Sequence, residues 1–276
     1  MRKRDAWGGR LVAATVVLVM AASAAHSATV SLSGREFRLD GQPFDLWGVR
    51  VASAIGTDAY TSHLIAQLDD YKAHGVNAVT VFYMGSSGGH YDPFTSDGKG
   101  WRYPVFRDRM DAIIEACDSR DMVVIAGIFY QWKTEELTDR SLTDWTASKE
   151  AVRTVANHLE SKGYTNVILN IANEQNSGGY TGEPWGRVQN TSDLLDMVAI
   201  AKNAHPGLIV GCGGYDHGKN VTLGSSSSVD VLLFDTLGPN SQEHSGYYHD
   251  YFVGKGIDDK PLVNVEMFGG WTKQFT

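Results

Sequence analysis

The chain has 276 residues, of which 42% are hydrophobic and 11% aromatic, and a formal net charge of -8. This length is sufficient for one large domain with a buried core. An acidic chain lacks the clustered Lys and Arg that bind a nucleic-acid backbone, so we expect no nucleic-acid partner. Seven Trp and twelve Tyr suit stacking against a carbohydrate, although most of them are expected in the core.

The first 28 residues have the pattern of a secretory signal peptide. Basic residues open the chain, residues 11–22 form an apolar stretch, and small residues follow as far as Ala28. The apolar stretch is too short for an ordinary membrane-spanning helix. We therefore expect a secreted or periplasmic protein that has no membrane contact once residues 1–28 are removed. Residues 29–276 then form a single domain.

The remaining sequence predicts seven apolar strands that alternate with helices. A hairpin over residues 30–39 comes first, followed by a tight turn at Asp40-Gly41. The expected strands cover residues 44–51, 78–83, 122–129, 167–169, 208–212, 229–234 and 262–265, and helices are expected over 62–74, 107–120, 146–162 and 191–203. The long loop over residues 84–105 is of the kind that usually carries function.

Repeated strand-helix units in one direction predict parallel strands joined by right-handed crossovers. The predicted fold is an α/β TIM (β/α)8 barrel. An open doubly wound sheet is less well supported, since no glycine-rich phosphate fingerprint follows the first strand. Only ten residues follow Glu266, which is too few for an eighth strand and its helix. We therefore expect a barrel truncated after its seventh strand, in a natural protein that continues further.

Carboxylates follow two of the predicted strands. Asn173-Glu174 comes after the fourth strand, and Glu266 comes directly after the seventh. Strand ends on this side of a barrel are where catalytic groups are found. Glycoside hydrolysis needs one carboxyl to protonate the leaving oxygen and a second on the opposite side, roughly 5–5.5 Å away in retaining enzymes.

Several stretches resemble the retaining glycoside hydrolases of the largest β/α-barrel clan, the cellulase and mannanase type of family 5. They are residues 40–44, 47–49 and 75–79, then Ala172-Asn173-Glu174 and Val265-Glu266. The resemblance implies that Glu174 is the acid/base, that Glu266 is the nucleophile, and that Asn173 binds the sugar hydroxyl beside the reacting carbon. It also implies hydrolysis of β-glycosidic bonds in a polysaccharide or oligosaccharide by double displacement.

The chain departs from this family at two positions. The family usually carries an Arg after its second strand, where this chain has Thr80, and a His after its third, where this chain has Tyr130-Gln131. Arg50, at the end of the first strand, is a candidate to hold the nucleophile ionised instead. A surface or interstrand ion pair is an equal alternative for Arg50.

Further residues are candidate substrate contacts because of their position. Trp132, Trp185 and Trp271 lie just past strand ends and could stack on sugar rings. Tyr130, at the end of the third strand, is a further candidate substrate contact. His244 and Tyr247 belong to the loop after the sixth strand, where the family often places a residue touching the nucleophile. Acidic residues in the loops show no regular ligand spacing, so we expect no metal and no cofactor.

Two rival functions stay open at this point. One is a non-catalytic carbohydrate-binding barrel, suggested by the two departures and the missing strand. The other is a metal-dependent hydrolase, which would need His or Asp clusters at several strand ends. Cys117 and Cys212 could form a disulfide, which sequence alone does not decide. We expect a monomer whose partner is its carbohydrate substrate.

Overall fold

The computed structural model describes residues 27–85, 91–130, 140–236 and 245–267. The expected signal peptide up to residue 26 lies outside these ranges, as do Trp132, His244 and Trp271. The prediction of an exported chain and the predicted roles of those three residues therefore stay predictions.

A small antiparallel sheet opens the described part of the chain. It consists of β1 (Val30–Ser33), β2 (Glu36–Leu39) and β3 (Gln42–Phe44). Asp40 and Gly41 both have positive φ, 51° and 77°, as the tight turn between β2 and β3 requires. The expected hairpin is confirmed. The expected strand over residues 44–51 is wrong in its first half, because Phe44 pairs with Phe37 of β2.

Seven parallel strands form the main sheet, in an order that follows the sequence. They are β4 (Gly48–Arg50), β5 (Ala78–Phe82), β6 (Val123–Phe129), β7 (Val167–Ala172), β8 (Ile209–Cys212), β9 (Val231–Thr236) and β10 (Leu262–Met267). Each strand pairs in parallel with the next, which leaves β4 and β10 as the two edges. Within the described ranges the molecule is thus a TIM barrel of seven strands, as predicted.

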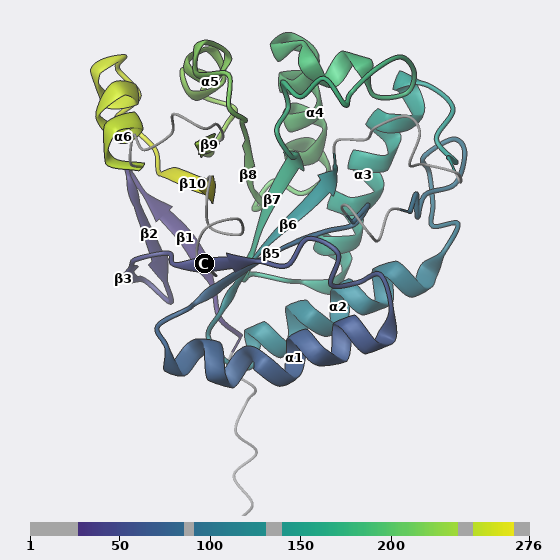
Figure 1. The fold of residues 1–276 in the computed structure, drawn as a ribbon, viewed down its shortest axis with the longest axis horizontal. Coiled ribbons are helices and arrows are strands. Elements are labelled where there is room, and N and C mark those ends of the chain that lie inside the picture. The colour runs from purple at the N-terminus through teal and green to yellow at the C-terminus, as the bar shows by residue number, and fades with distance from the viewer. Residues whose placement is uncertain (1–26, 86–90, 131–139, 237–244, 268–276) are drawn as a thin grey trace, which may run out of the picture.

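Helices surround this sheet on its outer side, while β1, β2 and β3 lie to the left beside β10 (Figure 1). The helices are α1 (Asp58–Ala73), α2 (Pro104–Asp118), α3 (Trp145–Lys162), α4 (Thr191–Ala204), α5 (His217–Gly224) and α6 (Ser245–Gly254), with a short 3-10 helix η1 (Gly186–Gln189). Residues 245–254 were expected in a loop, so Tyr247 lies on a helix instead. Helix α1 starts four residues before its predicted start, because the Thr57 side chain accepts a hydrogen bond from the Tyr60 backbone N–H.

Alternate residues of each strand face opposite sides of the barrel wall. On β9, Val231 and Leu233 belong to the small cluster inside the barrel, whereas Leu232 and Phe234 pack in the larger cluster with the helices. The inner cluster also contains Val30 and Phe37 of the N-terminal sheet, with Ala78, Val123, Ile125, Ile168 and Ile209. The N-terminal sheet therefore contributes side chains to the core inside the barrel.

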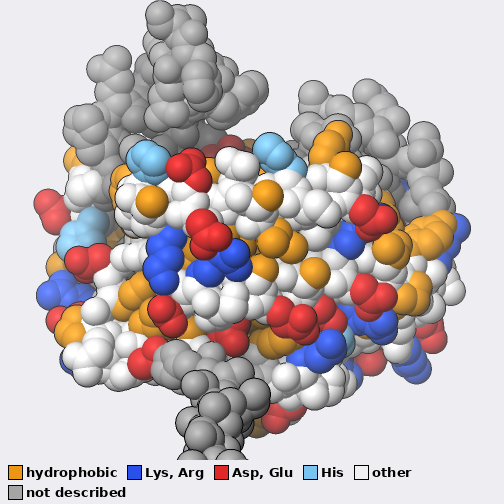
Figure 2. Space-filling view, turned by 90° about the horizontal axis from the view of Figure 1, so that it is seen from below, with side chains coloured by type: hydrophobic (Ala, Val, Ile, Leu, Met, Phe, Trp, Pro, Cys, Tyr) orange, Lys and Arg blue, Asp and Glu red, His pale blue; other side chains and the backbone are white. Residues whose placement is uncertain are grey.

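Figure 2 shows the face formed by α1 and α2, where acidic and basic side chains are interspersed. Arg109 of α2 forms an ion pair with Asp58 of α1, and Arg120, just after the end of α2, forms one with Asp69 of α1. No helix in the described ranges combines the length and apolar character needed to cross a membrane.

Candidate active site

Glu174 occupies a strained turn at the carboxyl end of β7. Its backbone has φ 44°, in the left-handed region that non-glycine residues seldom adopt. The side chain is 5% exposed, and the preceding Asn173 is 1% exposed. Strained backbone of this kind is concentrated at functional sites, where the surrounding structure maintains it.

Tyr180, which was not predicted as a site residue from the sequence, supports the turn that carries Glu174. Its hydroxyl donates to the backbone oxygens of Asn173 at 2.7 Å and Phe129 at 3.2 Å. Tyr180 thus ties the end of β7 to the end of β6. Burial raises the pKa of Tyr180 well above its usual range, so the hydroxyl keeps the proton that it donates.

The loop after β8 supports the turn from the other side. The Gln175 backbone N–H donates to the Gly213 oxygen at 3.1 Å. A Cβ at Gly214 would lie 2.3 Å from Asn176 Oδ1 and 3.0 Å from the Gln175 nitrogen. The absence of a side chain at Gly214 is therefore needed for the two loops to approach each other.

The amide groups on either side of Glu174 are buried and have no hydrogen-bond partner in the part of the chain that the structure describes. Neither side-chain atom of Asn173 makes a hydrogen bond to a described residue, and the same is true of Gln175. Buried polar atoms are nearly always hydrogen-bonded in native proteins. Unpaired amides next to a catalytic candidate indicate that a ligand or ordered water completes them.

A β-bulge orients Glu266 on β10. The register between β10 and β9 shifts between Asn264 and Glu266, so that Glu266 stands opposite Asp235. Without the bulge, Val265 would stand there and Glu266 would turn toward the helices, since side chains alternate along a strand. The Asn264 side chain accepts from the Glu266 backbone N–H at 3.3 Å and donates to the Thr236 hydroxyl at 2.9 Å, which fixes the bulge.

Arg50 contacts Glu266 directly. Its guanidinium donates through Nη1 to Glu266 Oε2 and through Nη2 to the Tyr130 hydroxyl, the latter at 2.7 Å. The guanidinium also lies over the rings of Phe82 and Tyr130, with its central carbon 5.4 Å and 5.3 Å from the centroids. Arg50 on β4 is the register partner of Thr80 on β5. The first strand therefore supplies a guanidinium at the level where the second strand has Thr80.

The charges around Arg50 and Tyr130 keep both groups protonated. Burial acts to lower the pKa of Arg50, but Tyr130, Glu266, Asp235 and Glu174 outweigh it and raise that pKa. Burial raises the pKa of Tyr130 to about 12, partly opposed by Arg50. Arg50 is thus a permanent cation, and Tyr130 is a neutral phenol that accepts its hydrogen bond.

Asp235 is a third carboxyl at this end of the barrel, and the sequence analysis missed it. It is 1% exposed, and the pKa of Asp235 is raised well above its usual range, first by burial. The expected strand ended at residue 234, two residues before the end of β9 at Thr236. The alternation of Val231, Leu233 and Asp235 is the signal that would have placed its side chain inside the barrel.

Glu174 and Glu266 belong to one electrostatic site. Both act on the pKa of Arg50, of Tyr130 and of Asp235. They lie at the carboxyl ends of β7 and β10, which are the fourth and seventh strands of the barrel. No group of three or more His, Cys, Asp or Glu suited to a metal ion occurs in the described part of the chain.

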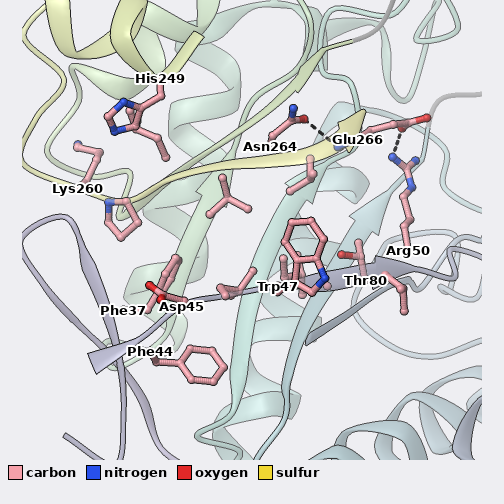
Figure 3. Close-up of a pocket in the computed structure, with 18 of the residues that line it drawn as sticks. Phe37, Phe44, Asp45, Trp47, Arg50, Thr80, His249, Lys260, Asn264 and Glu266 are labelled. Atoms are coloured by element: carbon pink, nitrogen blue, oxygen red, sulfur yellow. Dashed lines mark hydrogen bonds and ion pairs between the residues drawn. The ribbon is translucent and has the colours of Figure 1, made fainter. Parts of the chain in front are cut away.

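A cavity of about 1150 Å³ opens between the edge strands β4 and β10. Arg50, Glu266, Thr80 and Tyr130 line one end of it. Figure 3 shows the dashed contact between Arg50 and Glu266 on one side, with Trp47 and the aromatic rings of Phe37 and Phe44 further along. The ion pair is therefore reached through the open side of the barrel.

Other predicted contacts are placed differently. Trp185 is only 1% exposed and packs in the core, so its predicted role as a sugar platform is wrong. Tyr247 lies on α6, where its ring meets Tyr248 edge to face at 5.1 Å. Cys117 and Cys212 are both buried and free, so no disulfide joins them.

A (β/α) barrel with a pair of carboxylates at the carboxyl ends of its strands has the architecture of a glycoside hydrolase. The chain belongs to the cellulase family, glycosyl hydrolase family 5, whose model matches residues 37–234. That match includes Glu174 and stops short of Asp235 and Glu266. Comparison with curated protein sequences finds no match.

Solved structures share the fold at low sequence identity. An endo-1,4-beta-mannanase from Rhizomucor miehei has a TM-score of 0.60 and 18% identity, with 85% of this chain and 80% of that one covered. A beta-glucanase from Saccharophagus degradans has a TM-score of 0.56 and 14% identity, covering 87% and 73%. A family 5 glycoside hydrolase from Bacteroides vulgatus has a TM-score of 0.61 and 16% identity, covering 87% of this chain but only 53% of that one.

Proposed function

We propose that this glycoside hydrolase cleaves β-glycosidic bonds of a polysaccharide or oligosaccharide by double displacement, with retention of configuration. The observation that carries the proposal is that Glu174 and Glu266 share one site around Arg50. In this proposal Glu266 attacks the anomeric carbon, and Glu174 protonates the departing oxygen. Glu174 then removes a proton from the water that releases the product.

The surroundings of the two carboxyls differ in a way that suits separate roles. Glu266 accepts a hydrogen bond directly from the Arg50 guanidinium. Glu174 sits in a buried turn and is 5% exposed. Two carboxyls in contrasting environments are the usual basis of an acid and a nucleophile at one pH.

The proposed substrate is a β-linked glucan or mannan. Structures of similar fold are named as a beta-mannanase and a beta-glucanase, which supports this class without choosing between the two sugars. In this proposal Asn173, whose buried amide has no hydrogen-bond partner among the described residues, binds the hydroxyl beside the reacting carbon. We also propose that residues 1–28 direct export, which brings the enzyme to polymers outside the cell.

The test compares Glu266→Ala and Glu174→Ala on a polysaccharide and on an aryl glycoside with a good leaving group. Glu266→Ala is expected to be inactive on both, with activity restored by azide. Glu174→Ala is expected to keep part of its activity on the aryl glycoside, where protonation matters less. Proton NMR of the first product formed by the unaltered enzyme should show the anomer of the substrate.

A non-catalytic carbohydrate-binding barrel is the competing function, because the barrel lacks an eighth strand in the described ranges. The two functions give opposite results for the unaltered chain and for Glu174→Gln. An enzyme releases reducing sugar and loses this activity with Glu174→Gln. A pure binder releases none and retains its affinity for the polysaccharide in that variant.

A further inference from the structure

Asp235 faces the inside of the barrel at the level of the proposed nucleophile. Val231 and Leu233, which precede it at alternate positions on β9, both pack inside the barrel. The same alternation turns Asp235 inward. Its register partner on β10 is Glu266, which the bulge brings into the same phase. Asp235 is therefore a neighbour of Glu266 across two hydrogen-bonded strands.

The carboxyl of Asp235 has no hydrogen-bond partner among the described residues, at either oxygen. Burial raises the pKa of Asp235, Arg50 opposes that rise, and Glu174 and Glu266 add to it. Tyr180 is a further titratable group within electrostatic reach. The raised pKa favours the protonated form of Asp235, which has one O–H to donate and a carbonyl oxygen to accept.

Other buried acids of this chain have structural partners. Asp92 accepts backbone N–H groups from Phe94, Ser141 and Leu142. Asp111 pairs with the side chains of His158 and Lys162. Asp235 has no such contact, and a leucine would fill its position at lower energetic cost. An unpaired carboxyl in such a place points to a partner that arrives with the substrate.

We propose that Asp235 contacts the substrate directly and hydrogen-bonds a hydroxyl of the sugar ring held between Glu174 and Glu266, so that it helps to select the sugar. This inference rests on the proposed function. A site built to hydrogen-bond a hydroxyl rejects analogues that lack it, because its own buried group is then left unpaired.

The first test uses Asp235→Leu and Asp235→Asn. Both variants are expected to melt at a higher temperature than the unaltered enzyme at neutral pH, because each removes a buried carboxyl without a partner. Asp235→Leu should lower kcat/KM by about 100-fold, and Asp235→Asn, which keeps a donor and an acceptor, by less than about 10-fold. The matched control is Asp92→Leu, which should lower the melting temperature because three N–H groups lose their acceptor.

Two results would overturn the proposal. Asp235→Leu could melt at a lower temperature than the unaltered enzyme, which indicates a structural role, or it could melt at a higher temperature with unchanged kcat/KM. The protonation state has a separate readout. The pKa of Asp235 is raised in the folded protein. Its contribution to the free energy of unfolding is therefore complete below about pH 3.9, the usual pKa of an unfolded Asp, and falls as the pH rises above that value. Asp235→Asn should lack this fall in its unfolding free energy.

The second test identifies the hydroxyl. The probes are 4-nitrophenyl β-glucoside and β-mannoside, whichever the unaltered enzyme hydrolyses, and their monodeoxy derivatives. Removal of one hydroxyl should cost the unaltered enzyme about 100-fold in kcat/KM and should cost Asp235→Leu little, because the two changes remove the same contact. Equal losses in both enzymes at every position would overturn the assignment.

Failure of the proposed function is recognised separately. If the unaltered chain hydrolyses no glycoside, the enzyme proposal fails, and calorimetric binding of cellotetraose and mannotetraose then tests Asp235 alone. Binding that weakens by about 10-fold or more in Asp235→Leu supports the contact. Binding that is unchanged in the variant, or absent from the unaltered chain, overturns it. If Asp235→Leu hydrolyses the substrate as fast as the unaltered enzyme, the proposed role of Asp235 is wrong and the proposed function is unaffected.

Discussion

Arg50 and Glu266 form an ion pair although they lie 216 positions apart and on opposite edge strands of the sheet. The pair thus joins β4 to β10, the two edge strands of the sheet in the described part of the chain. The contact binds the proposed nucleophile and at the same time links the two edges. Loss of the guanidinium should therefore affect both activity and stability.

Arg50→Met is expected to lower kcat/KM by about 100-fold or more, since the nucleophile loses its charged donor. The free energy of unfolding should fall by about 1–3 kcal/mol, a range that allows for the partial exposure of the pair. Arg38→Met is the matched control, because Arg38 pairs with Glu36 at the exposed surface of β2. It should change stability by less than about 0.5 kcal/mol and leave activity intact.

Tyr130→Phe removes the hydroxyl that accepts a hydrogen bond from Arg50 Nη2. At about pH 8 the variant should be roughly 1 kcal/mol less stable in urea unfolding. Burial raises the pKa of Tyr130 to about 12, so its stabilising contribution is complete below about pH 10 and is lost as pH approaches 12. The difference between the two proteins should shrink at about pH 11. An unchanged difference would contradict the buried, protonated phenol.

Gly214→Ala should displace the turn that carries Glu174. Its Cβ would overlap Asn176 Oδ1 at 2.3 Å and crowd the Gln175 nitrogen. We expect a loss of about 1–3 kcal/mol of stability and a fall in kcat larger than the change in KM. Gly178→Ala is the control, from the loop after β7 that carries Glu174, because a Cβ there meets nothing within 4 Å. Similar effects in both variants would argue against the close approach.

The two cysteines should be unreactive in the native protein. Burial raises the pKa of Cys117 and of Cys212 to about 12, and both side chains are packed in the core. A disulfide-exchange reagent at about pH 8 should label neither thiol in the folded chain and both after unfolding in guanidinium. Fewer than two thiols in the unfolded, unreduced protein would reveal a disulfide and contradict the structure.

Strand order and the proposed carboxylates followed from local patterns. Apolar runs such as residues 122–129 and 167–169 are buried strands in the structure, and Glu174 and Glu266 stand at the ends expected for them. These features depend on periodicity within a few residues. Sequence reasoning detects that periodicity directly, because burial on both faces of a parallel sheet leaves a continuous apolar run.

What sequence reasoning missed depends on how strands pair. The apolar pattern over residues 44–51 looked like one strand, although the Asp40-Gly41 turn pairs Phe44 with Phe37 in a hairpin. The bulge before Glu266 is visible only in the register with β9. Asp235 carries no motif, and its importance arises from unpaired burial beside two other carboxyls.

The N-terminal sheet has a consequence for the order in which the chain can fold during translation. The Val30 backbone N–H donates to the Thr165 oxygen at 2.9 Å, and the Ala28 N–H donates to Asp118 at 2.8 Å. Ala28 therefore meets Asp118 only after 90 further residues have been synthesised, and Val30 meets Thr165 only after 135. Contacts of such long sequence separation form slowly. The core cluster that Val30 and Phe37 complete inside the barrel also contains Ile168 of β7, so it is assembled only once β7 has been synthesised.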